Sequence, residues 1–101
     1  MKLFIDTSDS KRIIVGIDGE KFEEKSRKEK SQILIYFLDK LLKKKNLNFQ
    51  DIKEIRVNTG PGSFTGLRVG VSVAAALGWV LGIPVNGKIL RKGEKLGIKY
   101  E

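Results

Sequence analysis

The sequence predicts an α/β fold, with a mixed sheet and two main helices. Three observations predict it: an Asp18-Gly19 turn between β-branched and charged segments, a helical apolar repeat after it, and a strand that leads through a glycine-rich turn into an uncharged helix. The order meander, helix, strand, helix, strand is an α/β pattern, and the strands that flank the second helix should be parallel.

The first 25 residues predict a three-stranded antiparallel meander. Residues 3–6 read as a short buried strand, and residues 12–17 form a β-branched run. Asp18-Gly19 is the strongest short hairpin signal, and residues 21–25 then form the return strand. The charges of this return strand indicate that it lies at the sheet edge.

The first helix is predicted by apolar spacing. Ser26 and Glu29 fit a capping box before it. A core-facing stripe accounts for most of the pattern, and a second contact surface on this helix stays open. The stripe consists of Ile33, Leu34, Phe37, Leu38, Leu41 and Leu42.

A strand over residues 52–58 leads into the glycine-rich segment 60–68. Gly66 is followed by Leu67 and Arg68, so the lysine of a Walker A motif is missing. The glycine spacing is also one residue too long for a dinucleotide fingerprint. The segment therefore either binds an anion through free N–H groups or lets two pieces of backbone pack closely, and we favour packing.

The second helix, expected over residues 67–82, is apolar on every face. A domain this small offers one sheet face and one neighbouring helix to cover it, so some apolar surface should be left exposed for another protein. Small residues such as Gly70, Ala74 and Gly78 would let a partner helix approach. The alternative is complete burial inside a monomer.

Composition restricts the chemistry that is available. The 101 residues are enough for one domain, and they include no cysteine and no histidine, which leaves no thiolate and no imidazole for catalysis or metal binding. The net charge of +8 comes from scattered lysines, which solvated faces explain better than a nucleic-acid site. We expect a cytoplasmic protein, because a helix over residues 67–82 would reach only about 24 Å across a ~30 Å bilayer core.

Four segments carry a family resemblance. They resemble the N-terminal lobe of the TsaB family and are the nonapeptide Gly60-Pro61-Gly62-Ser63-Phe64-Thr65-Gly66-Leu67-Arg68, the opening Ile5-Asp6-Thr7-Ser8, Ser31-Gln32 with Ile33, Leu34 and the Leu41-Leu42 pair, and Gly82-Ile83-Pro84-Val85. The nonapeptide is highly specific, and the other three are supportive. The resemblance covers residues 1–87, and residues 88–101 are a basic C-terminal extension without family counterpart, either a hairpin or a loosely ordered tail.

The resemblance implies a single actin-like (ribonuclease-H-like) lobe with a five-stranded mixed sheet. It also implies a non-catalytic scaffold that supports threonylcarbamoyladenosine modification of tRNA by dimerising with a TsaD-like catalytic subunit. A TsaE-like ATPase in the same complex and a weak tRNA contact are further implied partners. Three alternatives stay open: a homodimer without TsaD, a small nucleotide- or phosphate-binding enzyme, and an RNA-binding accessory.

The resemblance and the apolar pattern together give the expected site residues. No catalytic residue, cofactor or metal is expected, and a single lobe without a second one has no cleft to close on ATP. Asp6, Thr7, Gly62 and Ser63 are weak phosphate candidates, although Asp6 is expected to cap a turn. For Arg68 two roles are expected: it contacts a partner's acidic groups or tRNA phosphate, or it bonds only to the loop's own carbonyls. The expected partner interface is Ile33, Phe37, Leu41, Gly70, Val73, Ala74, Ala75, Leu77, Gly78 and Leu81.

Overall fold

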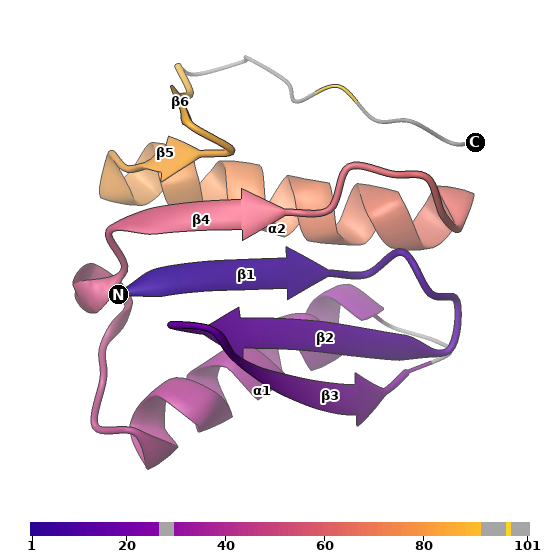
Figure 1. Cartoon of the computed structure of the whole chain (residues 1–101), viewed down its shortest axis with the longest axis horizontal. Coiled ribbons are helices and arrows are strands. Elements are labelled where there is room, and N and C mark those ends of the chain that lie inside the picture. Colours follow the sequence, from indigo (N-terminus) through magenta and orange to yellow (C-terminus); the bar gives the residue numbers. More distant parts are fainter. Residues whose placement is uncertain (27–29, 92–96, 98–101) are drawn as a thin grey trace.

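A six-stranded mixed sheet in the order β3-β2-β1-β4-β5-β6 organises the fold. The computed structural model describes residues 1–26, 30–91 and 97, and for Phe64 the backbone alone. Both helices lie behind the sheet in Figure 1. The elements are β1 (Lys2–Asp6), β2 (Arg12–Ile17), β3 (Glu20–Lys25), α1 (Lys30–Lys44), the short 3₁₀ helix η1 (Phe49–Asp51), β4 (Glu54–Val57), α2 (Phe64–Leu81), β5 (Pro84–Val85) and β6 (Lys88–Ile89).

The predicted meander is confirmed. β1 pairs antiparallel with β2, and β2 pairs antiparallel with β3. Asp18 and Gly19 both have positive φ, at 50° and 90°, as a tight two-residue hairpin turn requires. The Asp18 carboxylate also accepts a hydrogen bond from the Lys2 N–H at 2.8 Å, which ties the turn to β1. Charged side chains make β3 the exposed edge strand that its composition predicted.

The parallel pairing predicted around the second helix is also confirmed. β4 lies between β1 and β5 and pairs in parallel with both. β5 is only two residues long, and Asn86 extends its ladder with its side chain. The Asn86 amide accepts from the Val57 N–H at 2.9 Å and donates to the Val57 carbonyl at 3.0 Å. The carboxyl ends of β1 and β4 therefore meet at one edge of the sheet (Figure 1).

The prediction of five strands was one strand short. β6 turns back antiparallel onto β5 through Asn86 and Gly87, whose φ values are 51° and 83°. An Asn-Gly pair with two positive φ angles is a hairpin turn of the same kind as Asp18-Gly19. The domain boundary expected at residue 87 falls inside this hairpin, and Leu90 is buried in the core. Predictions for residues 92–96 and 98–101 lie outside the described residues.

The first helix uses the stripe that its spacing predicted. Leu34, Phe37, Leu38, Leu41 and Leu42 are buried against the sheet, and Ile33 is partly buried beside them. The facing strand residues come from alternate positions of the central strands, which places the core between the sheet and the helices. Glu29, the second member of the predicted capping box, lies outside the described residues.

The second helix begins three residues earlier than predicted. It runs over Phe64–Leu81, because the Ser63 hydroxyl caps it by accepting from the Gly66 N–H at 3.3 Å. Gly82 ends it in the left-handed conformation, with φ of 67°. Half of the glycine-rich segment is therefore helix rather than loop. Within the part of the chain that the structure describes, no helix is long and apolar enough to cross a membrane.

Candidate interaction surface

Three glycines four residues apart bring the start of α2 against the end of β1. A Cβ atom at Gly62 would lie within 3.0 Å of Ser8, one at Gly66 within 3.0 Å of the Thr7 carbonyl oxygen, and one at Gly70 within 3.0 Å of the Thr7 hydroxyl. Real Cβ atoms essentially never make contacts this short. These glycines are therefore needed for the close approach of two segments of the same chain.

The Thr7 side chain joins this contact by hydrogen bonds. Thr7 is fully buried, and its hydroxyl donates to the Gly66 carbonyl and accepts from the Gly70 N–H at 3.0 Å. In an uninterrupted α-helix the N–H of residue 70 pairs with the carbonyl of residue 66. The hydroxyl thus bonds to both members of one helical pair, which fixes α2 on β1.

Four backbone N–H groups of the glycine-rich segment have partners inside the chain. Gly60 donates to the Asn58 side chain at 3.0 Å, Ser63 to the Ser8 carbonyl at 2.8 Å and Leu67 to the Ser63 carbonyl at 2.9 Å. The Gly66 N–H is held by the Ser63 cap. An anion cradle needs such donors to be free. These four donors are not available to an anion, and together with the close approach of the glycines to Thr7 and Ser8 this favours the packing interpretation of the motif.

Asp6 links the ends of the two central strands. Its Oδ1 atom accepts from the Ser8 N–H at 2.9 Å, from the Ser8 hydroxyl at 2.6 Å and from the Asn58 amide at 3.2 Å. A carboxylate that accepts from a residue two positions later forms a turn of its own. Across the described residues, no three acidic, histidine or cysteine side chains gather to hold a metal ion.

Replacing Asp6 tests this structural interpretation. We expect Asp6→Ala to lower the free energy of unfolding by about 1–2 kcal/mol, because Ser8 and Asn58 lose their acceptor. Asp6→Asn keeps an oxygen at the same place and should lose less. Urea unfolding followed by circular dichroism measures both. Equal losses in the two variants would show that the negative charge matters rather than the acceptor.

An apolar groove runs between the two helices on the side away from the sheet. One part has a volume of about 300 Å³ and, apart from Ser72, is lined by apolar residues. A second hollow of about 340 Å³ adjoins it, with Ser72 and Val73 shared. We call the two together the α1–α2 groove. Its lining residues are Ser31, Ile35, Phe49, Thr65, Arg68, Val69, Ser72, Val73, Ala76 and Leu77.

Several large apolar side chains of the two helices are exposed. Ile35 and Tyr36 of α1 are 53% and 68% exposed, and Trp79 and Val80 of α2 are 50% and 72% exposed. None of these four was among the predicted interface residues. The signal was present in the sequence, because Ile35 and Tyr36 are apolar or aromatic at positions off the core-facing stripe.

Five of the ten predicted interface residues are partly exposed, and five are buried. Val73 and Leu77 line the α1–α2 groove, and Ala75 and Leu81 are partly buried against the core. Ile33 lies on the other side of α1, near β3. The remaining five are buried within the chain and cannot meet a partner from this surface: Phe37, Leu41, Gly70, Ala74 and Gly78.

The small residues of that buried group allow α2 to pack closely against other parts of the same chain. Ala74 is fully buried, and a Cβ atom at Gly78 would lie within 3.0 Å of the Val85 side chain on β5. Arg68 is exposed at the end of the groove near Thr65. The structure therefore brings Val73 and Leu77 together with Ile35 and leaves most of the predicted set in the core.

Comparison with known proteins shows to which family this chain belongs. The family model described as TsaD, tRNA N6-adenosine threonylcarbamoyltransferase, matches residues 23–87. The chain belongs to the TsaD family. The matched segment contains α1, β4 and α2 with the complete glycine-rich motif, so the similarity covers the elements that build the groove.

The relatives of this TsaD-family chain include TsaB proteins. Over 37 residues it is 51% identical to the tRNA threonylcarbamoyladenosine biosynthesis protein TsaB of Bacillus subtilis, covering 37% of this chain and 16% of that protein. Over 67 residues it is 33% identical to the tRNA N6-adenosine threonylcarbamoyltransferase of Persephonella marina, covering 66% and 20%. The predicted resemblance to TsaB is confirmed.

A solved structure shows the same fold. YeaZ from Pseudomonas aeruginosa superimposes with a TM-score of 0.70 at 25% identity, covering 83% of this chain and 41% of YeaZ. The chain thus spans less than half the length of YeaZ and smaller shares of the B. subtilis and P. marina relatives. The match places this chain in a family involved in threonylcarbamoyladenosine biosynthesis on tRNA.

Proposed function

We propose that this chain is a non-catalytic scaffold that supports threonylcarbamoyladenosine modification of tRNA by pairing with a TsaD-like catalytic subunit in the cytoplasm. The observation that carries the proposal is the apolar α1–α2 groove, whose lining includes the exposed side chain of Ile35. An apolar surface of this kind on a small domain indicates a protein contact.

The groove suits a helix better than a small molecule. It is elongated along two helices, and the small residues Ser72 and Ala76 at its centre let a partner backbone come near. Helices pack at axial distances of about 8–10 Å when the side chains at the contact permit it. A TsaD-like subunit, which belongs to the same family, would present a corresponding pair of helices. The shared family therefore supports a helix-against-helix pairing.

The non-catalytic part of the proposal rests on the end of β1. The Thr7 hydroxyl is held between two α2 backbone groups, and the Asp6 Oδ1 atom accepts three hydrogen bonds. A nucleophile or general base needs a reacting group within hydrogen-bond reach and free to exchange a proton. The Thr7 hydroxyl and the Asp6 Oδ1 atom are instead engaged in hydrogen bonds that fix the strand ends.

Mixing the chain with the TsaD homologue of its source tests the proposal. We expect size-exclusion chromatography with light scattering to give a one-to-one heterodimer, with further assembly if a TsaE-like ATPase is added. Calorimetry of the chain with ATP and Mg²⁺ should give no heat. A self-dimer that ignores TsaD would replace the proposal by the homodimer alternative, which the same groove also fits.

A further inference from the structure

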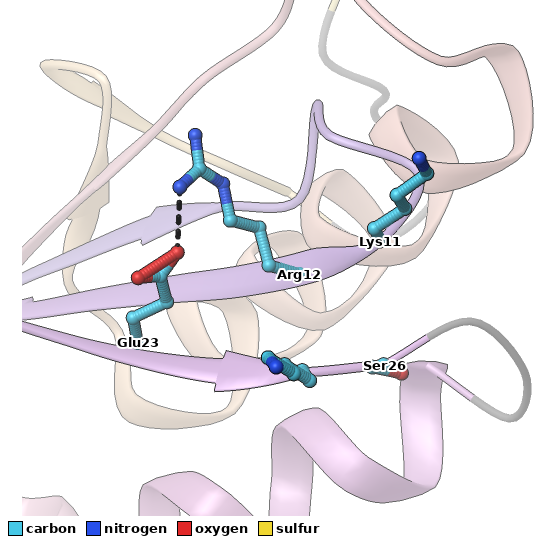
Figure 2. A pocket seen from close by; sticks show the side chains of 5 residues that line it. Lys11, Arg12, Glu23 and Ser26 are labelled. Atoms are coloured by element: carbon cyan, nitrogen blue, oxygen red, sulfur yellow. Dashed lines mark hydrogen bonds and ion pairs between the residues drawn. The ribbon is translucent and has the colours of Figure 1, made fainter.

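Another hollow, separate from the α1–α2 groove, lies where β2 begins and β3 ends. Its volume is about 630 Å³, and its lining shares no residue with the α1–α2 groove. Figure 2 shows Lys11, Arg12 and Ser26 where β2 begins and β3 ends, with Glu23 further back along β3. We call it the β2–β3 hollow. It is lined by Lys11, Arg12, Glu23, Lys25 and Ser26, three cations with one carboxylate.

A buried lysine fixes the backbone next to the β2–β3 hollow. The Lys30 ammonium donates to the Asp9 carbonyl at 2.8 Å and to the Arg12 carbonyl at 3.2 Å. Burial lowers the pKa of Lys30, since it disfavours the charged form, and nearby Asp9 opposes this. The Ser26 N–H donates to the Lys11 carbonyl at 2.9 Å. The backbone that carries the cations is therefore fixed at several points.

Of the cations that line the hollow, Arg12 is paired with carboxylates, whereas Lys11 and Lys25 are not paired with any described carboxylate. The Arg12 guanidinium contacts Glu23 at 2.7 Å and Asp9 at 3.1 Å, and these hydrogen bonds and charges raise its pKa (Figure 2). Arg12 and Lys25 are opposite each other in the β2–β3 ladder, and like charges in that position destabilise a sheet. Among the described residues, the Lys11 and Lys25 ammonium groups have no ion-pair partner.

We propose that the β2–β3 hollow binds the phosphate backbone of a nucleic-acid strand, with Lys11 and Lys25 as the contacting cations. An anion placed there would relieve the repulsion between Arg12 and Lys25. Four of its five lining residues are exposed, whereas a small-molecule site buries most of its ligand. A net charge of +8 also attracts a polyanion over a long range. This inference goes beyond the proposed scaffold role and does not depend on it.

Charge-neutralising variants of the full chain test the proposal. Binding of labelled single-stranded RNA, and of DNA of the same sequence, is measured by fluorescence anisotropy over a salt series. We expect Lys11→Gln with Lys25→Gln to weaken binding about tenfold at low salt. The slope of log K against log salt should become shallower by about 1.4, since each lost contact to a single strand contributes about 0.7.

A matched double variant distinguishes binding at the β2–β3 hollow from attraction by the net charge of the whole chain. Lys44→Gln with Lys53→Gln removes the same charge from exposed positions outside the hollow, and we expect at most a twofold to threefold loss. Lys11→Arg with Lys25→Arg should retain binding. Equal losses in the two glutamine doubles, no RNA or DNA binding by the unchanged chain, or equally tight binding of inorganic phosphate in the hollow would each overturn the proposal.

Discussion

Replacing Gly66 by alanine should lower the free energy of unfolding by about 1–2 kcal/mol, the net of packing strain and helix propensity. The new Cβ atom would lie within 3.0 Å of the Thr7 carbonyl oxygen, which belongs to the backbone and cannot rotate away. Forcing a methyl group into a closed contact typically costs about 1–3 kcal/mol. Alanine favours the helix by about 1 kcal/mol over glycine, which offsets only part of this strain.

Gly70→Ala makes the same clash with a different kind of atom. There the new Cβ would meet the Thr7 hydroxyl and, at 3.3 Å, the Thr7 methyl group, which are side-chain atoms. Thr7→Ala removes both, so it should relieve Gly70→Ala but leave Gly66→Ala as destabilising as before. Thr7→Ala alone should cost about 1–2 kcal/mol through its lost hydrogen bonds.

Urea unfolding of the singles and doubles gives the coupling energies directly. Gly97→Ala is the matched control, because a Cβ at Gly97 meets nothing within 4 Å, and its effect should stay within about 0.5 kcal/mol. If Gly66→Ala were as mild as Gly97→Ala, the contact with Thr7 would not be the reason for glycine. Equal relief of both clashes by Thr7→Ala would contradict the assignment of the two contacts.

The meander, the α1 stripe and the parallel strands could be predicted from the sequence because each has a local signal. Asp18-Gly19 specifies its turn through positive φ, and the spacing from Leu34 to Leu42 specifies one helix face. These signals depend on residues that are close in the sequence. They needed no knowledge of which distant segment would pack against them.

One strand was not counted and one helix start was wrong, although their signals were present. The Asn86-Gly87 turn has the same chemistry as Asp18-Gly19, and a hairpin after it was one of the two alternatives, but β6 was not included in the expected five-stranded sheet. The early start of α2 was missed because three glycines in seven residues predict a loop. Gly66 is helical only because the Ser63 cap and the close packing of Thr7 outweigh its low helix propensity.

The interface prediction shows what a sequence pattern leaves open. Gly70, Ala74 and Gly78 were expected at a partner contact because small residues let another backbone approach. Small residues indicate a close neighbour, and here the neighbours are Thr7 on the end of β1 and Val85 on β5. Which face of an apolar helix the chain covers itself is decided by long-range packing. Ile35 and Tyr36 lie off the core-facing stripe in the sequence, but it is the fold that shows them, together with Val80, to be exposed.

A single charge in the α1–α2 groove should abolish pairing with the TsaD-like subunit. Ala76 is exposed and lines the groove, so Ala76→Glu can be introduced without disturbing the core. In a helix-against-helix contact the carboxylate would lose its water without gaining a partner, at a cost of several kcal/mol. Because each 1.4 kcal/mol is a factor of ten, we expect the dissociation constant to rise at least a hundredfold.

The choice of position decides whether that result is informative. Leu77→Glu places the same charge in the groove, but Leu77 also packs against the core, so a lost complex would be confounded by lost stability. Lys21→Gln changes the net charge by the same amount as Ala76→Glu and lies on β3, next to the Phe4 ring and outside the groove lining. It should leave the dissociation constant within twofold of the unchanged chain. A folded Ala76→Glu variant that still formed the complex at full strength would move the contact away from this groove, and Val80→Glu, one turn further along α2, would then locate it.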